Sequence, residues 1–253
     1  HGGLVPTLTN ETPRHWMDRK IVLLDNPDRP APLEERVVKL SDRALLSMST
    51  RLIVVAFDPG GTTGWSVMMA TYADLKDPRK PIQNHLQRWY HGQVDCGSTS
   101  GNAADSASAN DYDLGISETG EAAGVAICEN IIGESMALAL GPIAVVIEDF
   151  IIDPERMNTG RDFLSPVRVM SRLEQLLWES RSSTVHKQMP SEKPTASDDR
   201  LKMWGMYSGG TGDRHSRDAD RHALIFLRKL KQKQGRIRTA FPQIAEARKR
   251  GLL

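Results

Sequence analysis

Cysteine is scarce in this sequence, and the two residues present, Cys96 and Cys128, stand far apart. They lack the Cys-x-x-Cys spacing that a metal site or a redox motif needs. Two isolated thiols are typical of a reducing compartment, so we expect both to serve only in packing.

Long hydrophobic runs are also lacking. No apolar run approaches the length that crosses a bilayer, and the first residues do not show the basic-then-apolar order of a secretory signal. We therefore expect a cytoplasmic protein that does not associate with membranes.

Neither sign of charge is in excess, since the formal net charge is only +1. The distribution is uneven, however, because residues 105–134 are acidic and nine Lys or Arg residues from Arg228 onward face a single acid, Glu246. Such a basic end indicates a polyanionic partner, with a solvated tail as an equally weighted alternative.

With 253 residues, 39% of them hydrophobic and 26% charged, the chain is long enough for one substantial core. We expect three parts: an N-terminal arm with a short helix over 1–50, a main domain over 51–232, and a basic C-terminal tail over 233–253. The short helix is predicted within 33–48.

The main domain begins with the stretch LIVVAFDPGGTTGWSV, residues 52–67. It predicts a strand that ends at Asp58, a tight turn through Gly60 and Gly61, and a second strand over 65–72. A carboxylate at the end of a core strand must be paired, protonated or bound to a cation. The alternative is that Asp58 merely caps the turn.

Further elements follow in an order typical of a mixed α/β sheet. A strand over 86–94 precedes a helix over 120–134, and the unbroken apolar run IAVVIEDFII predicts a central strand covered on both faces. Beyond it we expect a long helix over 161–180, a strand over 183–189, a short helix that starts at Asp198 or Asp199, and a last helix in RHSRDADRHALIFLRKLKQ.

Acids fall where a core would not tolerate them unpaired: at Asp58, in the pair Glu148-Asp149, and at the start of the last helix. Converging carboxylates suit Mg²⁺, and two such ions about 4 Å apart would hydrolyse a phosphodiester. Because Glu148 and Asp149 are adjacent in a strand, only one of them can join Asp58. On the last helix His215 and Asp218 share a face, whereas Asp220 is turned away by roughly 200°.

The segments FDPGGTTGW, VVIEDF and HSRDADRHAL, taken together, resemble those of the RuvC-type Holliday-junction resolvases, and the sequence is similar to phage-encoded members. The resemblance covers roughly residues 52–230. It implies a ribonuclease H-like fold, in which a five-stranded mixed sheet is flanked by helices, and it marks 51–232 as the nuclease domain. It further implies cleavage of Holliday junctions and other branched DNA with Mg²⁺, for which Mn²⁺ substitutes, in the host cytoplasm if the protein is phage-encoded.

The resemblance carries four residues over as catalytic and metal-binding: Asp58, Glu148, His215 and Asp218. We expect Asp58 to bridge two metal ions, Glu148 and Asp218 to hold one side each, and His215 to ligate a metal or orient the attacking water. His222, one turn after Asp218, is expected to be structural. Whether Asp149 or Asp220 assists is left open.

Contacts to DNA are assigned more loosely. Phe150 lies near the position of an aromatic that stacks on a base in the family, and Lys187 or Lys193 could assist at the scissile phosphate. Phosphate contacts are expected from the tail and from Arg161, Arg168 and Arg172. The helix over 161–180 is the predicted homodimer contact, since symmetric cutting of a four-way junction requires two sites related by a two-fold axis.

Two other functions stay open. The segment DPGGT also resembles the first phosphate-binding loop of the sugar-kinase and actin-like ATPases, but the chain is short for their two-lobed architecture. The second is a protein that binds junction DNA without cutting it. The complete acidic set argues against that possibility.

Overall fold

The computed structural model describes residues 30–96, 120–150, 164–209 and 213–253. Five strands form one sheet in the order β3-β2-β1-β4-β5, and among them β2 alone runs antiparallel to the rest. The strands are β1 (Leu52–Asp58), β2 (Thr62–Ala70), β3 (Arg88–Asp95), β4 (Ile143–Glu148) and β5 (Ser183–Gln188). This arrangement confirms the predicted ribonuclease H-like α/β fold.

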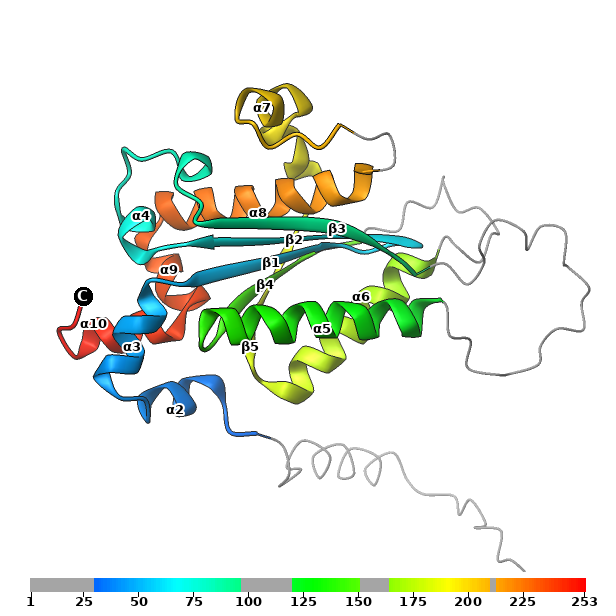
Figure 1. The fold of residues 1–253 in the computed structure, drawn as a ribbon. Coiled ribbons are helices and arrows are strands. Elements are labelled where there is room, and N and C mark those ends of the chain that lie inside the picture. Colours follow the sequence, from blue (N-terminus) through cyan, green and yellow to red (C-terminus); the bar gives the residue numbers. More distant parts are fainter. Residues whose placement is uncertain (1–29, 97–119, 151–163, 210–212) are drawn as a thin grey trace, which may run out of the picture.

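Helices cover both faces of the sheet, with α8 on one side and α5 and α6 on the other (Figure 1). The α-helices are α2 (Leu33–Val38), α3 (Asp42–Ser49), α4 (Tyr72–Lys76), α5 (Glu121–Ala139), α6 (Ser165–Ser180), α7 (Asp198–Met203), α8 (Arg214–Gln232), α9 (Gln234–Ala240) and α10 (Pro242–Lys249), and two 3₁₀ segments are η1 (Ile82–Asn84) and η4 (Pro190–Ala196). Helix α7 stands beyond α8, on the side away from the sheet (Figure 1).

The alternation of side chains along β1 and β4 builds two separate cores. Even-numbered residues such as Val54 and Val146 pack with α8, and odd-numbered ones such as Val55 and Val145 pack with α5 and α6. All of them are fully buried, as expected of central strands covered on both faces. Each large aliphatic side chain buried in this way stabilises the fold by about 1.5 to 3 kcal/mol.

The C-terminal segment differs from the prediction. Instead of a basic tail, it forms α9 and α10. Phe241, between the two helices, and Ile244 of α10 are fully buried. The apolar residues recur three to four positions apart, so they line one helical face although basic residues dominate the composition. Arg250 ties this end to the N-terminal helices through the carbonyl oxygens of Val38 and Leu40.

The predicted short helix over 33–48 is two helices. Ser41 breaks it, since its hydroxyl accepts the Ala44 N–H and starts α3 as an N-cap. These helices share an apolar cluster with α10, in which Leu33, Val37 and Leu45 meet Ala247. The two ends of the described chain therefore pack on each other.

Helix α5 is longer than predicted, and its length bears on the expectation that no apolar run could cross a membrane. Among the described helices it alone is long and apolar enough to cross a membrane by length and composition. A core helix passes the same test, and one side of α5, with Val125, Cys128 and Ile132, packs against the sheet.

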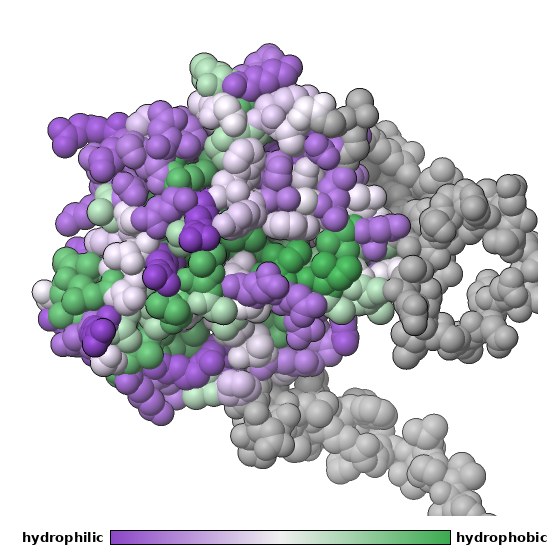
Figure 2. Space-filling view, viewed as in Figure 1, coloured by the Kyte–Doolittle hydropathy of each residue, from purple (hydrophilic) through white to green (hydrophobic). Residues whose placement is uncertain are grey.

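The surface in the view of Figure 2 is largely hydrophilic, with an apolar band between the sheet edge and α5. A groove of about 430 Å³ lies there, lined by Trp65, Tyr90 and Ile131 among others. Both cysteines are buried and unbonded, as predicted, and burial raises the pKa of the Cys128 thiol to about 12.

Candidate metal centre

Two neighbouring strand ends place the first two acids side by side. Phe57 pairs with Ile147 in the parallel ladder of β1 and β4, so the next residues, Asp58 and Glu148, lie next to each other at the carboxyl edge. Both are even-numbered and continue the row that faces α8. The strand register alone therefore brings the two carboxyl groups together under that helix.

The turn after β1 is closed by the buried Thr63, whose hydroxyl donates to the Gly60 carbonyl at 3.0 Å and accepts the Gly60 N–H at 3.2 Å. A little further on, Gly64 lies against the first turn of α8. A Cβ at Gly64 would collide with the backbone carbonyl of His215. The glycine thus permits a close approach that seats the start of α8 at the strand ends.

Helix α8 supplies the remaining groups of the cluster from one face. His215, Asp218 and His222 are spaced three and four residues apart, which places them in a row along the helix. The His215 Nδ1 lies 2.9 Å from Asp58 Oδ2, and the His222 Nε2 lies 2.8 Å from Glu148 Oε2. Each strand carboxylate therefore has a histidine from α8 beside it.

Lys193, from η4, lies at the centre of the cluster. Its Nζ is 2.6 Å from Glu148 Oε2, 3.0 Å from Asp218 Oδ2 and 3.1 Å from Asp58 Oδ1. Three carboxylates from three different elements thus direct oxygens at one positive charge.

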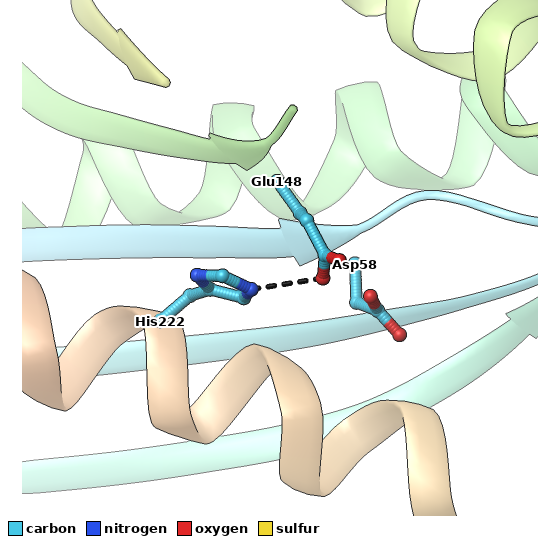
Figure 3. Close-up of side chains that lie close together, drawn as sticks. All are labelled: Asp58, Glu148 and His222. Carbon is cyan, nitrogen blue, oxygen red and sulfur yellow. Dashed lines mark hydrogen bonds and ion pairs between the residues drawn. The ribbon is translucent and has the colours of Figure 1, made fainter. Parts of the chain in front are cut away.

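The same position suits a divalent cation. Asp58, Glu148 and His222 each offer one ligand atom, and these atoms lie within 4.8 Å of one another (Figure 3). Carboxylate oxygen is the ligand that Mg²⁺ and Mn²⁺ favour, and imidazole nitrogen suits the softer divalent ions. The donor set, with an ammonium already held at its centre, fits a metal.

Burial perturbs the ionisation of three of these groups. It raises the pKa of Asp58, and the hydrogen bond with His215 opposes that effect. Burial alone would lower the pKa of Lys193, but the attraction of Asp58, Glu148 and Asp218 outweighs it and holds that pKa above the usual value. Burial, with the positive charge of Lys193, lowers the pKa of His222 to about 4.

A neutral His222 has one N–H for two neighbours. Its Nδ1 lies 2.8 Å from the Gln188 side-chain oxygen, while the Gln188 side-chain nitrogen is buried and has no hydrogen-bond partner among the described residues. Turning the Gln188 amide over would let it donate to Nδ1. The N–H on Nε2 would then donate to Glu148. His222 could ligate a metal through Nε2 only in the other tautomer, in which Nδ1 carries the proton and donates to the Gln188 side-chain oxygen.

Arg221 connects the cluster to the segment η4–α7. Its guanidinium donates to the carboxylates of Asp218 and Asp198, and its Nε donates to the Ala196 carbonyl at 3.0 Å. Because Arg221 is itself largely buried, these contacts hold both η4 and the start of α7 close to the acids.

The two acids left open by the sequence lie elsewhere. The Asp149 carboxylate is 3.8 Å from Lys187 Nζ, and Lys187 in turn pairs with Glu174. Asp220 is fully buried on the other side of α8, and it accepts hydrogen bonds from Ser66 and Trp89 at 2.7 Å. Neither contacts the cluster, as the strand and helix geometry predicts.

The predicted DNA contacts are scattered. Phe150, just beyond β4, is half-buried. On α6, Arg168 pairs with Glu121 at 2.9 Å and Arg172 contacts Gln175 at 3.1 Å. Arg161 lies outside the described residues. Of the two lysines considered for the scissile phosphate, Lys193 is in the cluster and Lys187 is outside it.

Sequence reasoning missed the place of His222 in the cluster. The signal was present, because His222 lies four residues after Asp218 and seven after His215, on the same helical face. The central place of Lys193 had no such signal, because η4 lacks a periodic pattern that would orient its side chains.

No protein-family model matches the sequence, and a comparison with curated protein sequences found no relative. Among solved structures, the fold is similar to that of T. thermophilus RuvC in complex with a Holliday junction substrate. The TM-score is 0.45 and the identity 15%, over 72% of this chain and 97% of the other. At this level the likeness concerns the fold alone.

Proposed function

We propose that this protein is a divalent-metal-dependent, structure-selective endonuclease that cleaves Holliday junctions and other branched DNA. One observation carries the proposal: Asp58, Glu148 and Asp218, from β1, β4 and α8, direct carboxylate oxygens at one point. Such a group is costly to bury unless it binds a cation, and hydrolysis of a phosphodiester is the chemistry that clustered acids with Mg²⁺ or Mn²⁺ perform.

Asp58 is the proposed bridging ligand, because it ends strand β1 beside Glu148 and its side chain is the least exposed of the three acids. Glu148 and Asp218 would hold the metal from either side. Bound divalent ions would supply an activated water and offset the charge that develops on the leaving oxygen. His215, which lies beside Asp58 and is partly exposed, would orient that water, and His222 would keep Glu148 in position.

The substrate would lie over the exposed side of the cluster, where cationic side chains are available to phosphates. Lys193, Arg168 and Arg172 are the described candidates, with Lys187 and Phe150 at the adjacent strand ends. Arg161, which lies outside the described residues, stays a proposed contact. A homodimer through α6 would supply the paired sites for symmetric cutting. In support, α6 exposes Trp178 beside a groove of about 830 Å³.

The kinase-like and actin-like alternative is disfavoured by the turn after β1. A phosphate-binding loop directs backbone N–H groups at its ligand, whereas here the Gly60 N–H is bonded inside the turn to Thr63. The alternative of a binding protein without catalysis does not account for three carboxylates that direct oxygens at one point. Both alternatives predict an intact substrate after incubation with Mg²⁺.

The test is incubation of labelled four-way junction, flap and linear duplex with the protein and Mg²⁺ or Mn²⁺. We expect metal-dependent cuts near the branch point, with the linear duplex as the poorest substrate. If every substrate stays intact with both metals, the endonuclease proposal is wrong. ATP-dependent phosphorylation of a small molecule would instead support the kinase-like class.

A further inference from the structure

Lys193 makes a set of contacts that no other described residue shares. Its ammonium reaches all three clustered carboxylates, whereas His215 pairs with Asp58, His222 with Glu148 and Arg221 with Asp218. The Lys193 side chain is only 21% exposed, and its nitrogen lies within 3.1 Å of an oxygen of each acid. It therefore neutralises the acids from the point toward which all three are directed.

A lysine ammonium and a divalent metal ion cannot occupy that point together. Oxygen ligands of a metal lie about 2.0 to 2.6 Å from the ion, and the Lys193 nitrogen already lies 2.6 Å from Glu148 and 3.0 Å from Asp218. Any cation that binds these oxygens must push the ammonium away. Binding is then an exchange of one cation for another.

We infer that Lys193 is a built-in counter-ion that fills the cation position of the metal-free protein and is displaced when a divalent metal binds. The inference rests on the proposed function in one respect, namely that the acids take a metal. It adds that Lys193 competes with the metal for the same oxygens, and this competition lowers the apparent affinity of the protein for the metal.

The surrounding contacts restrict the displacement to the side chain. The backbone of η4 is held by Arg221, which donates to the Ala196 carbonyl, and Glu192 of the same segment pairs with Lys229 of α8. These contacts do not involve the Lys193 ammonium, so they persist when it leaves. The flexible four-carbon stem then swings the charge toward solvent, beside the position proposed for the substrate phosphate.

The first test compares metal binding to the metal-free wild type and Lys193→Met by calorimetry with MnCl₂ at one pH. The methionine keeps most of the stem and removes the charge. We expect Lys193→Met to bind Mn²⁺ more tightly by about tenfold or more, the equivalent of one charge-assisted hydrogen bond. The control, Lys202→Met, removes a positive charge from helix α7 at a residue that pairs with Asp199 rather than with the three clustered acids. Its Mn²⁺ affinity should match that of the wild type.

The second test needs no variant, so it holds even if Lys193→Met folds poorly. An amine-reactive ester labels the wild-type protein with and without MnCl₂, and mass spectrometry follows Lys193 and Lys202. Lys193 should react slowly in the metal-free protein and severalfold faster with Mn²⁺, whereas Lys202 should not respond.

Equal or weaker Mn²⁺ affinity in Lys193→Met, or labelling of Lys193 that Mn²⁺ leaves unchanged, overturns the inference. Neither readout involves DNA. If both results are as expected and no DNA is cut, the proposed nuclease function fails while the counter-ion role stands. If DNA is cut, but Lys193→Met binds Mn²⁺ no more tightly than the wild type and Mn²⁺ leaves the labelling of Lys193 unchanged, only the counter-ion role fails.

Discussion

Replacing Asp220 by alanine should destabilise the protein strongly, because this buried carboxylate fastens α8 to the sheet. It is fully buried and accepts from Ser66 of β2 and from Trp89 of β3 at 2.7 Å. Its second oxygen lies 2.7 Å from Nδ1 of His91, whose pKa this contact raises. Helix α8 carries three residues of the candidate centre, so its attachment matters to the site.

The size of the destabilisation follows from the three groups that lose their partner when the Asp220 carboxylate is removed. Breaking a buried charge pair costs about 3 to 5 kcal/mol, and three net hydrogen bonds at about 1 to 1.5 kcal/mol each give a similar sum. We therefore expect Asp220→Ala to lower the free energy of unfolding by about 3 to 5 kcal/mol. Asp220→Asn keeps an acceptor for Ser66 and Trp89 and should lose about half as much.

Urea denaturation measures the difference in the free energy of unfolding, provided that the slope of this free energy against urea concentration is the same in both proteins. The control is Asp199→Ala on α7, where the side chain is 96% exposed and the expected change is under about 0.5 kcal/mol. A loss below about 1 kcal/mol in Asp220→Ala would refute the view that this network attaches the helix.

Three further outcomes are expected. Gly64→Ala should lower the free energy of unfolding by about 1 to 3 kcal/mol, because its Cβ would collide with the His215 carbonyl. It should also weaken Mn²⁺ binding, which calorimetry measures, whereas denaturation measures the loss of stability. Unchanged metal affinity would contradict the inference that Gly64 lets α8 approach the strand ends. Phe241→Ala should cost about 3 to 5 kcal/mol, since the ring is fully buried, and a negligible loss would mean that the C-terminal helices are not part of the core. His91 has a raised pKa, so its pairing with Asp220 stabilises the fold below the unfolded pKa of about 6.5 and is lost as the pH rises through the folded value. The stability gap between wild type and His91→Gln should accordingly shrink as the pH rises above about 6.5, and a gap that widens would reverse the assigned sign.

The sheet could be predicted from the sequence because its signals are local. Unbroken apolar runs mark β1 and β4 as central, and a period of two along β4 is enough to put Glu148 and Asp149 on opposite faces. The same argument separated Asp218 from Asp220, which proved to face opposite sides of α8. That Glu148 is the one beside Asp58 depends on the register between β1 and β4, which the period does not give.

Other features depend on contacts between distant segments, which a pattern along the chain does not reveal. At the C-terminal end basic residues dominate the composition, so the apolar positions that include the buried Phe241 and Ile244 were not recognised. Lys193 reaches the acids only because Arg221 and Lys229 fasten η4 to α8. His222 was on the expected face, but its role followed only once its ring was found beside Glu148.

The proposed cleavage of branched DNA depends on Asp58 and Glu148 as ligands of a divalent metal ion. Its most direct test is the single-turnover rate of four-way-junction cleavage in Mn²⁺ for the wild type, Asp58→Asn and Glu148→Gln. We expect the wild type to cut, and each variant to be slower by about 10³-fold or more, since losing a metal ligand removes several kcal/mol of transition-state stabilisation. Wild-type rates in both variants would contradict the account.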